Sequence, residues 1–127
     1  MSNYGELIVD EVVSVYDADT FRCNIFSLPP IIGENIPVRV LNVDCPEIRG
    51  KNEYEKRLAR DARDFTEMLL ENAFEIKLIN IQRGKYFRIM ASVLMDGCDL
   101  ADALINANLG RKYDLSLIHI SEPTRPY

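Results

Sequence analysis

Alternating apolar and polar positions are the main signal along the chain. Five segments have strand character from their β-branched and aromatic residues, and the third of them shows the alternation most clearly. They are residues 6–16, 20–28, about 37–43, 74–81 and 86–95. Between the second and third segments, Pro29, Pro30, Gly33 and Pro37 interrupt any ladder and predict a loop. The pattern therefore predicts five strands.

Apolar positions recur with a helical period between the third and fourth strands. They are Leu58, Ala62, Phe65 and Leu69, at i, i+4, i+7 and i+11. Asn52 and Glu55 form a capping-box-like pair just before this stripe. The sequence thus predicts an amphipathic helix over residues 53–72. A second helix is expected after Asp99, with Gly110 as its stop signal.

The order of elements predicts the fold class. Three strands, a helix, two strands and a helix favour a mostly β fold with α. The specific expectation is a five-stranded Greek-key barrel of the oligonucleotide-binding type (OB-fold), with one helix after strand 3 and a second helix after strand 5. A ferredoxin-like sheet would need its first helix after one strand, so the order disfavours that fold.

Length and composition favour one globular domain. The chain has 127 residues, of which 47% are hydrophobic and 28% charged. Residues 115–127 continue neither period and resemble a translated sequencing adapter, so we expect a domain over residues 1–114 and a non-native tail over 115–127. No apolar run approaches the roughly 20 residues that span a bilayer, and no signal peptide is visible. We therefore expect a cytoplasmic monomer without membrane contact.

Charge and residue types exclude several kinds of chemistry. The net charge of −5 argues against tight nonspecific binding to nucleic acid, although local arginines or a bound cation can still recruit phosphate. Three cysteines without C-x-x-C spacing fit neither a disulfide framework nor a zinc cluster. The single histidine, His119, lies in the expected tail. Histidine-based catalysis and histidine-bound metals are therefore disfavoured.

Acidic residues gather at the ends of predicted strands. Asp17 and Asp19 follow the first strand, and Asp44 and Glu47 follow the third. Hard oxygen ligands of this kind suit Ca²⁺ or Mg²⁺. Each acid also has an ordinary explanation, because aspartate is common in polar turns and often caps its own backbone. The acids alone leave both readings open.

Two arginines within apolar strands are harder to explain as structure alone. Arg39 alternates with Val38 and Val40, so it faces away from them, toward solvent or a polar barrel mouth. Arg88 stands near the start of another mostly apolar strand. A plain structural barrel gives no reason for either residue.

Several motifs resemble the staphylococcal nuclease-like (thermonuclease) family, in order and spacing. They are "VYDADTF", "VRVLNVDCPEIRGK", "EKRLARDARDFTEMLLENA", "KYFRIMASVLMDG" and "ALINANLGRKYD". The resemblance covers about residues 8–114. It implies an OB-fold nuclease, and it implies a further C-terminal helix, which is missing from this chain.

The resemblance implies a calcium site and a general base. Asp19 and Asp44 would ligate Ca²⁺ through their side chains, and Cys45 would do so through its backbone carbonyl. Glu47 would lie near a water molecule and act as the general base. A carboxylate is a reasonable base where histidine is lacking.

The resemblance also implies how a nucleic acid is held. Arg39 and Arg88 would bind the phosphate and stabilise its developing charge, as bidentate guanidinium groups can. Lys85, Tyr86 and Tyr113 would line the nucleotide.

Three positions depart from the family pattern. Cys45 stands where a threonine is usual, which a backbone ligand tolerates. Ala18 replaces a common glycine, so a positive φ at this position would carry strain. Phe87 replaces a glycine that usually precedes the arginine, which bears on access to the site.

Two hypotheses follow from different classes of protein. The first is a Ca²⁺-dependent nuclease that hydrolyses phosphodiester bonds of DNA, RNA or both. The alternative is a noncatalytic OB-fold module that binds nucleic acid. Such modules should lack some of the charged residues that hydrolysis needs. This sequence has all five: Asp19, Arg39, Asp44, Glu47 and Arg88.

Overall fold

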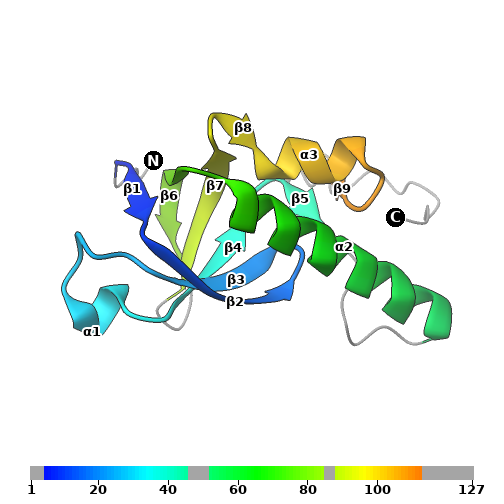
Figure 1. Cartoon of the computed structure of the whole chain (residues 1–127), viewed down its shortest axis with the longest axis horizontal. Helices are drawn as coiled ribbons and strands as arrows, with labels where there is room; N and C mark the ends of the chain where they lie inside the picture. The colour runs from blue at the N-terminus through cyan, green and yellow to red at the C-terminus, as the bar shows by residue number, and fades with distance from the viewer. Residues whose placement is uncertain (1–4, 46–51, 85–87, 113–127) are drawn as a thin grey trace.

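The computed structural model describes residues 5–45, 52–84 and 88–112, which form a mostly β structure with a curled sheet and three helices (Figure 1). The main sheet contains β1 (Leu7–Val9), β2 (Glu11–Asp17), β3 (Thr20–Asn24), β4 (Ile36–Val40), β6 (Ile76–Arg83), β7 (Ile89–Met95) and β8 (Cys98–Asp99). A second, two-stranded sheet pairs β5 (Val43–Asp44) with β9 (Arg111–Lys112). The helices are α1 (Pro30–Gly33), α2 (Glu53–Asn72) and α3 (Leu100–Asn106).

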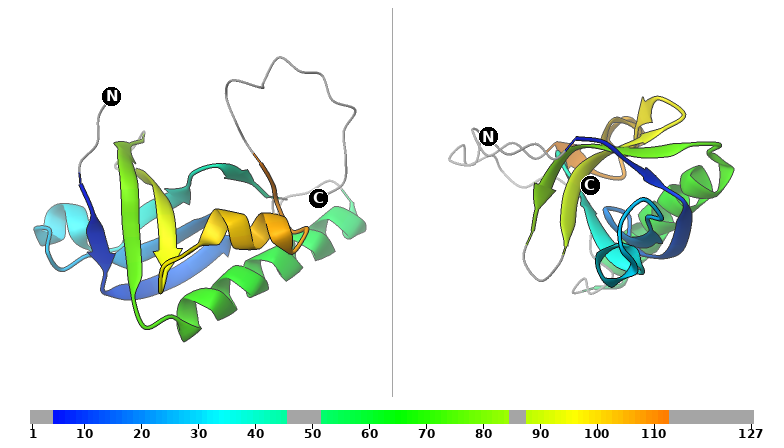
Figure 2. Two further views of the ribbon diagram at one scale, coloured as in Figure 1. Left: turned by 90° about the horizontal axis from the view of Figure 1, so that it is seen from above. Right: turned by 90° about the vertical axis from the view of Figure 1, so that its left-hand side faces the viewer.

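The main sheet curls because one stretch of chain serves both of its edges. Its strand order is β1-β6-β7-β4-β3-β2, with β8 paired to β7. β1 and β2 stand at opposite ends of this order, yet Asp10 alone separates them in the sequence. The chain therefore passes from one edge to the other within one residue, and the sheet bends toward a barrel, as the end-on view shows (Figure 2).

The core lies inside the curl, beneath the two longer helices. Helix α2 packs against β2, and α3 packs against β7. The largest fully buried side chains come from both layers: Phe21, Ile25, Leu78, Leu100 and Leu104. Burial of these apolar side chains is the dominant favourable contribution to folding.

Helix α2 covers the range that the apolar period predicts, residues 53–72. The Asn52 side chain accepts a hydrogen bond from the Glu55 amide at 2.8 Å, as the capping pattern indicates. Its buried face differs from the predicted stripe. Ala59, Ala62, Thr66 and Leu70 are buried, whereas Leu58, Phe65 and Leu69 are half-buried. Small residues on the inner face let α2 lie close to the sheet.

Several predicted strands are shorter or broken in the structure. The first predicted strand divides at Asp10, where the chain changes edge. The second ends at Asn24, so residues 25–28 leave the sheet. The third divides at a turn that contains Asn42, whose φ is 72°. Asparagine tolerates this left-handed conformation better than most residues.

The predicted loop over residues 29–37 contains the short helix α1, so the prediction of loop structure is wrong for Pro30–Gly33. Pro30 occupies the first helical position, where proline is favoured because the missing N–H would have no partner. Gly33 is required by close packing: a Cβ atom at this position would lie 2.5 Å from the Ile25 carbonyl oxygen.

Within the described ranges, no helix has the length and apolarity needed to cross a bilayer. The expected tail over residues 115–127 and the C-terminal end of the family fold lie outside the described residues. The domain boundary at residue 114, the oligomeric state and the cellular compartment stay predictions.

Candidate functional site

The turn between β2 and β3 carries a buried carboxylate. Asp19 is 7% exposed. Its Oδ2 lies 2.9 Å from Nη1 of Arg39, and its Oδ1 accepts a hydrogen bond from the Thr20 hydroxyl at 3.2 Å. The backbone amide of Cys45 also donates to this carboxylate. One side chain thereby connects the β2–β3 turn, β4 and the segment after β5.

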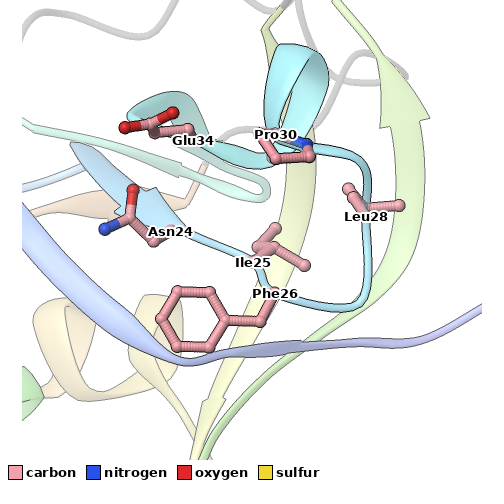
Figure 3. Close-up of a pocket in the computed structure, with 7 residues that line it drawn as sticks. Asn24, Ile25, Phe26, Leu28, Pro30 and Glu34 are labelled. Atoms are coloured by element: carbon pink, nitrogen blue, oxygen red, sulfur yellow. The ribbon is translucent and has the colours of Figure 1, made fainter.

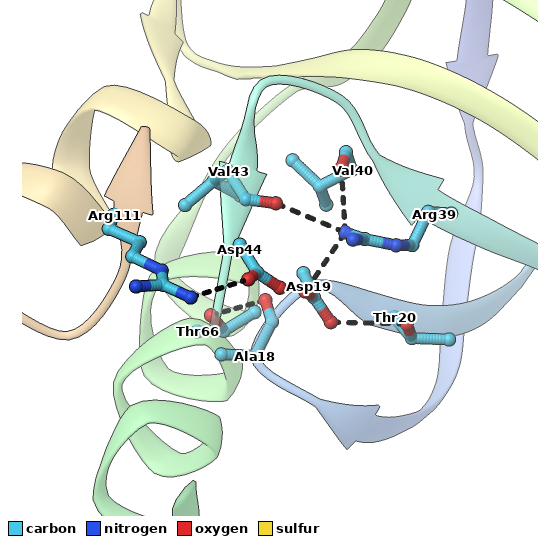
Figure 4. A network of polar contacts seen from close by, with 9 residues as sticks. All are labelled: Ala18, Asp19, Thr20, Arg39, Val40, Val43, Asp44, Thr66 and Arg111. Atoms are coloured by element: carbon cyan, nitrogen blue, oxygen red, sulfur yellow. Dashed lines mark hydrogen bonds and ion pairs between the residues drawn. The ribbon is translucent and has the colours of Figure 1, made fainter. Parts of the chain in front are cut away.

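Arg39 organises the turn between β4 and β5. Besides contacting Asp19, its Nη1 donates to the carbonyl oxygens of Val40, at 3.0 Å, and Val43, at 3.3 Å (Figure 4). These carbonyls flank the turn that contains Asn42. Arg39 therefore holds the turn that leads into Asp44. We call the group Asp19, Arg39, Asp44 and Cys45 the acidic corner.

Strand β9 closes the acidic corner from the C-terminal side. Arg111 lies opposite Asp44 in the β5–β9 pair, and its Nη2 is 3.7 Å from Asp44 Oδ2. Gly110 precedes it at a close approach. A Cβ atom at Gly110 would lie 2.7 Å from Cγ2 of Val43 and 3.0 Å from Sγ of Cys45. Glycine is therefore what allows β9 to pack against β5.

Arg88 immediately precedes β7, the strand that pairs with β4, which carries Arg39. β4 and β7 are parallel, and Arg39 is opposite Met90, two residues after Arg88. Residues two apart in an extended chain share a face, so Arg88 and Arg39 lie on the same face with Cα atoms roughly 8 Å apart. The Arg88 carbonyl accepts a hydrogen bond from the Gly84 amide at 2.7 Å. Its Nε is buried without a hydrogen-bond partner among the described residues.

Burial dominates the electrostatics of Asp19. Desolvation raises the pKa of this carboxyl above its ordinary value, and the charge of Asp17 raises it further. Arg39 is the largest opposing influence, and hydrogen bonds from Thr20 and Cys45 also lower the pKa, yet the net direction is upward. The neighbouring groups do not fully offset the cost of charging Asp19. An additional cation would stabilise its ionised form.

The pKa of the Cys45 thiol is also affected by the charges of the acidic corner. Burial is the largest cause that raises the pKa of its thiol, and Asp19 and Asp44 raise it further. Both carboxylates therefore lie near the Cys45 side chain. The thiol stays protonated at neutral pH, so this residue has a carbonyl oxygen, and no thiolate, to offer a cation.

The donor chemistry of the acidic corner fits Ca²⁺. Carboxylate and carbonyl oxygens are the ligands that this ion prefers, and burial raises the pKa of Asp19 despite its contact with Arg39. Among the residues that the structure describes, no group of three or more His, Cys, Asp and Glu side chains could hold a metal ion. A complete site would thus draw further ligands from backbone carbonyls or from water.

The structure brings together four of the predicted site residues: Asp19, Arg39, Asp44 and Cys45. Arg88 immediately precedes the adjacent strand, β7, on the face that Arg39 shares. The other four, Glu47, Lys85, Tyr86 and Tyr113, lie outside the described residues. Their roles, like the assigned roles of the first five, stay predictions.

Ala18 shows no sign of the strain considered from the sequence. It is fully buried, and it is not among the residues with positive φ. Its carbonyl accepts a hydrogen bond from the Thr66 hydroxyl of α2 at 2.8 Å. The turn thus accommodates alanine without the left-handed backbone that a glycine would permit.

Sequence reasoning missed three residues that contact the site: Thr20, Thr66 and Arg111. Thr66 had a usable signal, because it follows Ala62 by four residues and therefore belongs on the inner face of the helix. A hydroxyl on a buried face needs a partner, and this one finds it in the adjacent turn. Arg111 had no comparable signal, because its contact with Asp44 depends on the pairing of β5 with β9.

A pocket of about 220 Å³ lies at the opposite end of the sheet, beside α1 (Figures 1 and 3). Its lining includes Phe26, Leu28 and Pro30, and its polar groups include Asn24 and Glu34. None of the residues of the acidic corner lines it. This pocket and the charged groups are therefore separate features.

Comparison with known protein families gives a match over residues 37–121, to the model of staphylococcal nuclease homologues. No curated protein matches the chain significantly. The matched range includes Arg39, Asp44, Cys45 and Arg88. Asp19 precedes this range, and its carboxylate contacts Arg39 and the Cys45 amide. The match covers more than half of the 127 residues. The chain therefore belongs to the staphylococcal nuclease homologue family.

Proposed function

We propose that the chain is a Ca²⁺-dependent nuclease that hydrolyses phosphodiester bonds of DNA, RNA or both. One observation carries this proposal. In a chain of the staphylococcal nuclease homologue family, the buried Asp19 carboxylate lies against Arg39 and the Cys45 amide, at the strand end that bears Asp44. A turn with no task beyond reversing the chain would keep its charges in water, since burying a charge is costly.

The proposal extends to the fold and domain limits. We take the curled sheet to be the five-stranded Greek-key barrel of the OB type, with β1 and β2 together as one strand that bends at Asp10. The position of these two segments at opposite edges of the sheet supports closure. Residues 1–114 would form the nuclease domain, and residues 115–127 a tail outside it.

Three residues would hold the cation: Asp19 and Asp44 through their carboxylates, and Cys45 through its carbonyl oxygen. Bound Ca²⁺ would supply positive charge next to the phosphate, where negative charge develops during hydrolysis. Arg39 would keep the Asp19 carboxylate oriented through the contact at 2.9 Å. Arg111 would hold Asp44 from the opposite side.

The chain's own side chains would carry the remaining chemistry. Glu47 would accept the proton of the attacking water, since a carboxylate can serve as the general base and the single histidine of the chain, His119, lies in the expected tail. Arg39 and Arg88 would donate hydrogen bonds to the non-bridging phosphate oxygens. A guanidinium group has five N–H donors, so Arg39 can contact a phosphate while its Nη1 holds the turn. Charge in place before reaction stabilises the transition state.

Lys85, Tyr86 and Tyr113 would bind the nucleotide next to the reacting phosphate. An ammonium group attracts the neighbouring phosphate, and a tyrosine ring can stack on a base of any identity. These contacts would favour single-stranded segments, in which base faces are accessible. They would give the protein affinity without strict sequence preference.

A digestion assay tests the proposal most directly. The full chain is incubated with single-stranded DNA, and in parallel with RNA, first with Ca²⁺, then with excess chelator, and finally with Ca²⁺ restored. We expect cleavage in the first and third conditions and none in the second. Arg88→Ala is the control for a contaminating nuclease, because cleavage by the chain itself should be lost in this variant.

The same samples separate the enzyme from a binding module. Fluorescence anisotropy of a labelled oligonucleotide measures affinity under each condition. A folded wild-type chain that binds the oligonucleotide in saturating Ca²⁺ without cleaving it would reject the nuclease and favour the noncatalytic OB-fold module. Cleavage that persists in the chelator would reject the role of the cation.

A further inference from the structure

Helix α2 reaches the acidic corner through a single hydroxyl group. Ala59, Ala62 and Thr66 are buried on its inner face, and their small side chains let the helix approach the β2–β3 turn. The Thr66 side chain has no exposure to solvent, and its hydroxyl donates to the Ala18 carbonyl at 2.8 Å (Figure 4). Ala18 is also fully buried, so water cannot replace this donor.

The carbonyl that Thr66 holds belongs to the peptide unit that joins Ala18 to Asp19. Because the peptide unit is planar, fixing its oxygen also fixes the amide nitrogen and the Cα of Asp19. The next peptide unit is fixed as well, since the Asp19 carbonyl accepts a hydrogen bond from the Val40 amide at 2.9 Å. Both peptide planes around Asp19 are therefore held, one by α2 and the other by β4.

With the backbone held on both sides, the rotation of the side chain decides where the Asp19 carboxylate points. Arg39 and Thr20 restrain this rotation through contacts at 2.9 and 3.2 Å. Thr66 acts on the backbone instead, because its hydrogen bond sets the position of the Asp19 Cα, from which the side chain extends. A displacement of this backbone would move both carboxylate oxygens together.

We propose that Thr66 is a positioning residue for the cation site, one that sets Ca²⁺ affinity through Asp19 without touching the cation or the substrate. This inference rests on the proposed function, because it takes Asp19 to be a ligand. It goes beyond that function by assigning a role to a residue of α2. A hydroxyl that merely anchored the helix would affect stability and leave Ca²⁺ affinity unchanged.

Three variants separate positioning from stability. Thr66→Val keeps the shape of the side chain and removes the donor, whereas Thr66→Ser keeps the donor and removes a methyl group. Ser92→Ala is the matched control, because Ser92 is also buried and its hydroxyl accepts a hydrogen bond from Asn80 of β6 at 3.3 Å, a contact that does not involve the β2–β3 turn. Isothermal titration calorimetry with Ca²⁺ alone measures affinity, and thermal unfolding without Ca²⁺ measures stability.

We expect Thr66→Val to weaken Ca²⁺ binding by about 10–100-fold, the range typical of residues that orient metal ligands. Thr66→Ser should stay within about threefold of the wild type, and so should Ser92→Ala, although both lose some stability. If Thr66→Val is partly unfolded, the titrations of all four proteins are repeated in sucrose, which favours the folded state.

The possible results distinguish this inference from the proposed function. Wild-type affinity in Thr66→Val would overturn the role of Thr66 and leave the calcium site intact. An equal loss in Thr66→Val and Ser92→Ala would also overturn it, because the loss would then follow stability. A wild-type chain that binds no Ca²⁺ would overturn both the inference and the proposed cation site.

Discussion

The β2–β3 turn and α1 lie at opposite ends of the sheet (Figure 1). The turn buries a carboxylate, whereas the α1 loop exposes apolar side chains. Asp19 is 7% exposed, but Phe26 and Ile31 are 68% and 88% exposed. Each end also uses an acid and an arginine to hold backbone. At the α1 end, Asp10 accepts from the Phe26 amide at 2.6 Å, and Arg22 donates to the Asn35 carbonyl at 2.7 Å.

The two ends differ in what surrounds these charges. Asp10 and Arg22 are exposed, so water completes their solvation. Asp19 and Arg39 contact each other where both side chains are largely shielded from water. Burial raises the pKa of Asp19 despite this contact. A solvated charge needs no further partner, whereas a buried carboxylate that its neighbours have not neutralised retains affinity for a cation. The comparison therefore favours the acidic corner as the place of the proposed cation site.

The strongest test of the comparison removes one acid from each end. Asp19→Asn takes away a cation ligand and the partner of Arg39, so we expect cleavage to fall by about 10³-fold, the upper end of the cost of losing one stabilising group. Calorimetry should show a parallel loss of Ca²⁺ affinity. Asp10→Asn is the matched control, and we expect it to lower stability without changing Ca²⁺ affinity. Equal Ca²⁺ binding by the two variants would end the distinction between the two regions.

A second pair of variants compares the arginines. Arg88→Lys keeps the charge but loses the planar fork of donors, so kcat should fall on the order of 10²–10³, with a smaller change in KM. Arg22→Lys is the control at the α1 end, where the contact is to a backbone carbonyl. Steady-state cleavage of an oligonucleotide checks both. Undiminished turnover in Arg88→Lys would refute the role assigned to Arg88.

A third pair concerns two glycines that pack closely. Ala at Gly33 would place a methyl group 2.5 Å from the Ile25 carbonyl oxygen, and Ala at Gly110 would place one 2.7 Å from Val43 Cγ2. Overpacking costs typically 1–3 kcal/mol, so both variants should be destabilised by about this amount in urea unfolding. Only Gly110→Ala should also weaken Ca²⁺ binding, because it displaces residues next to Asp44. Loss of Ca²⁺ affinity in Gly33→Ala would contradict the separation of the two ends.

The smallest expected effect concerns a buried thiol. Burial raises the pKa of Cys23 to about 12 from 9.0, and the charge of Asp10 adds to the rise. The unfolded chain thus loses this proton at lower pH than the folded chain does. The stability that the buried thiol confers is fully present below pH 9 and is lost as the pH rises toward 12. Between pH 9 and 10 the free energy of unfolding should fall by about 1 kcal/mol more in the wild type than in Cys23→Ala.

Thiol labelling gives an independent check of burial. Cys98 is exposed, whereas Cys23 and Cys45 are buried. We expect a thiol reagent to modify Cys98 rapidly in the folded protein and the other two after unfolding. Rapid labelling of Cys45 in the native state would show that the acidic corner opens to water.

The sequence predicted elements whose apolar residues recur with a clear helical or strand period. It did not predict element boundaries that tertiary contacts determine. The range of α2 followed from its apolar spacing and from Asn52. The division of the first strand at Asp10 has no local signal, since the surrounding residues keep strand character on both sides. It arises because the chain must pair with β6 on one side and with β3 on the other.

The candidate site was accessible from sequence only in part. Residue types at strand ends indicated the grouping of Asp19 with Asp44, and an arginine in an apolar strand singled out Arg39. The contact between Arg111 and Asp44 was not accessible, because it depends on which segment pairs with β5. Thr66 was overlooked because the predicted stripe was centred on larger apolar residues, whereas the helix turns its small residues inward.

The parallel pairing of β4 with β7 has a consequence for the order in which the nascent chain acquires its groups. The β2–β3 hairpin and β4 are close in sequence, so Asp19 and Arg39 can meet early in synthesis. Strand β7 leaves the ribosome seconds later, at about 5–20 residues per second. Until then β4 has an unpaired edge, the kind of edge on which chains aggregate. The unfinished chain would thus hold the acid and the first arginine while it still lacks Arg88.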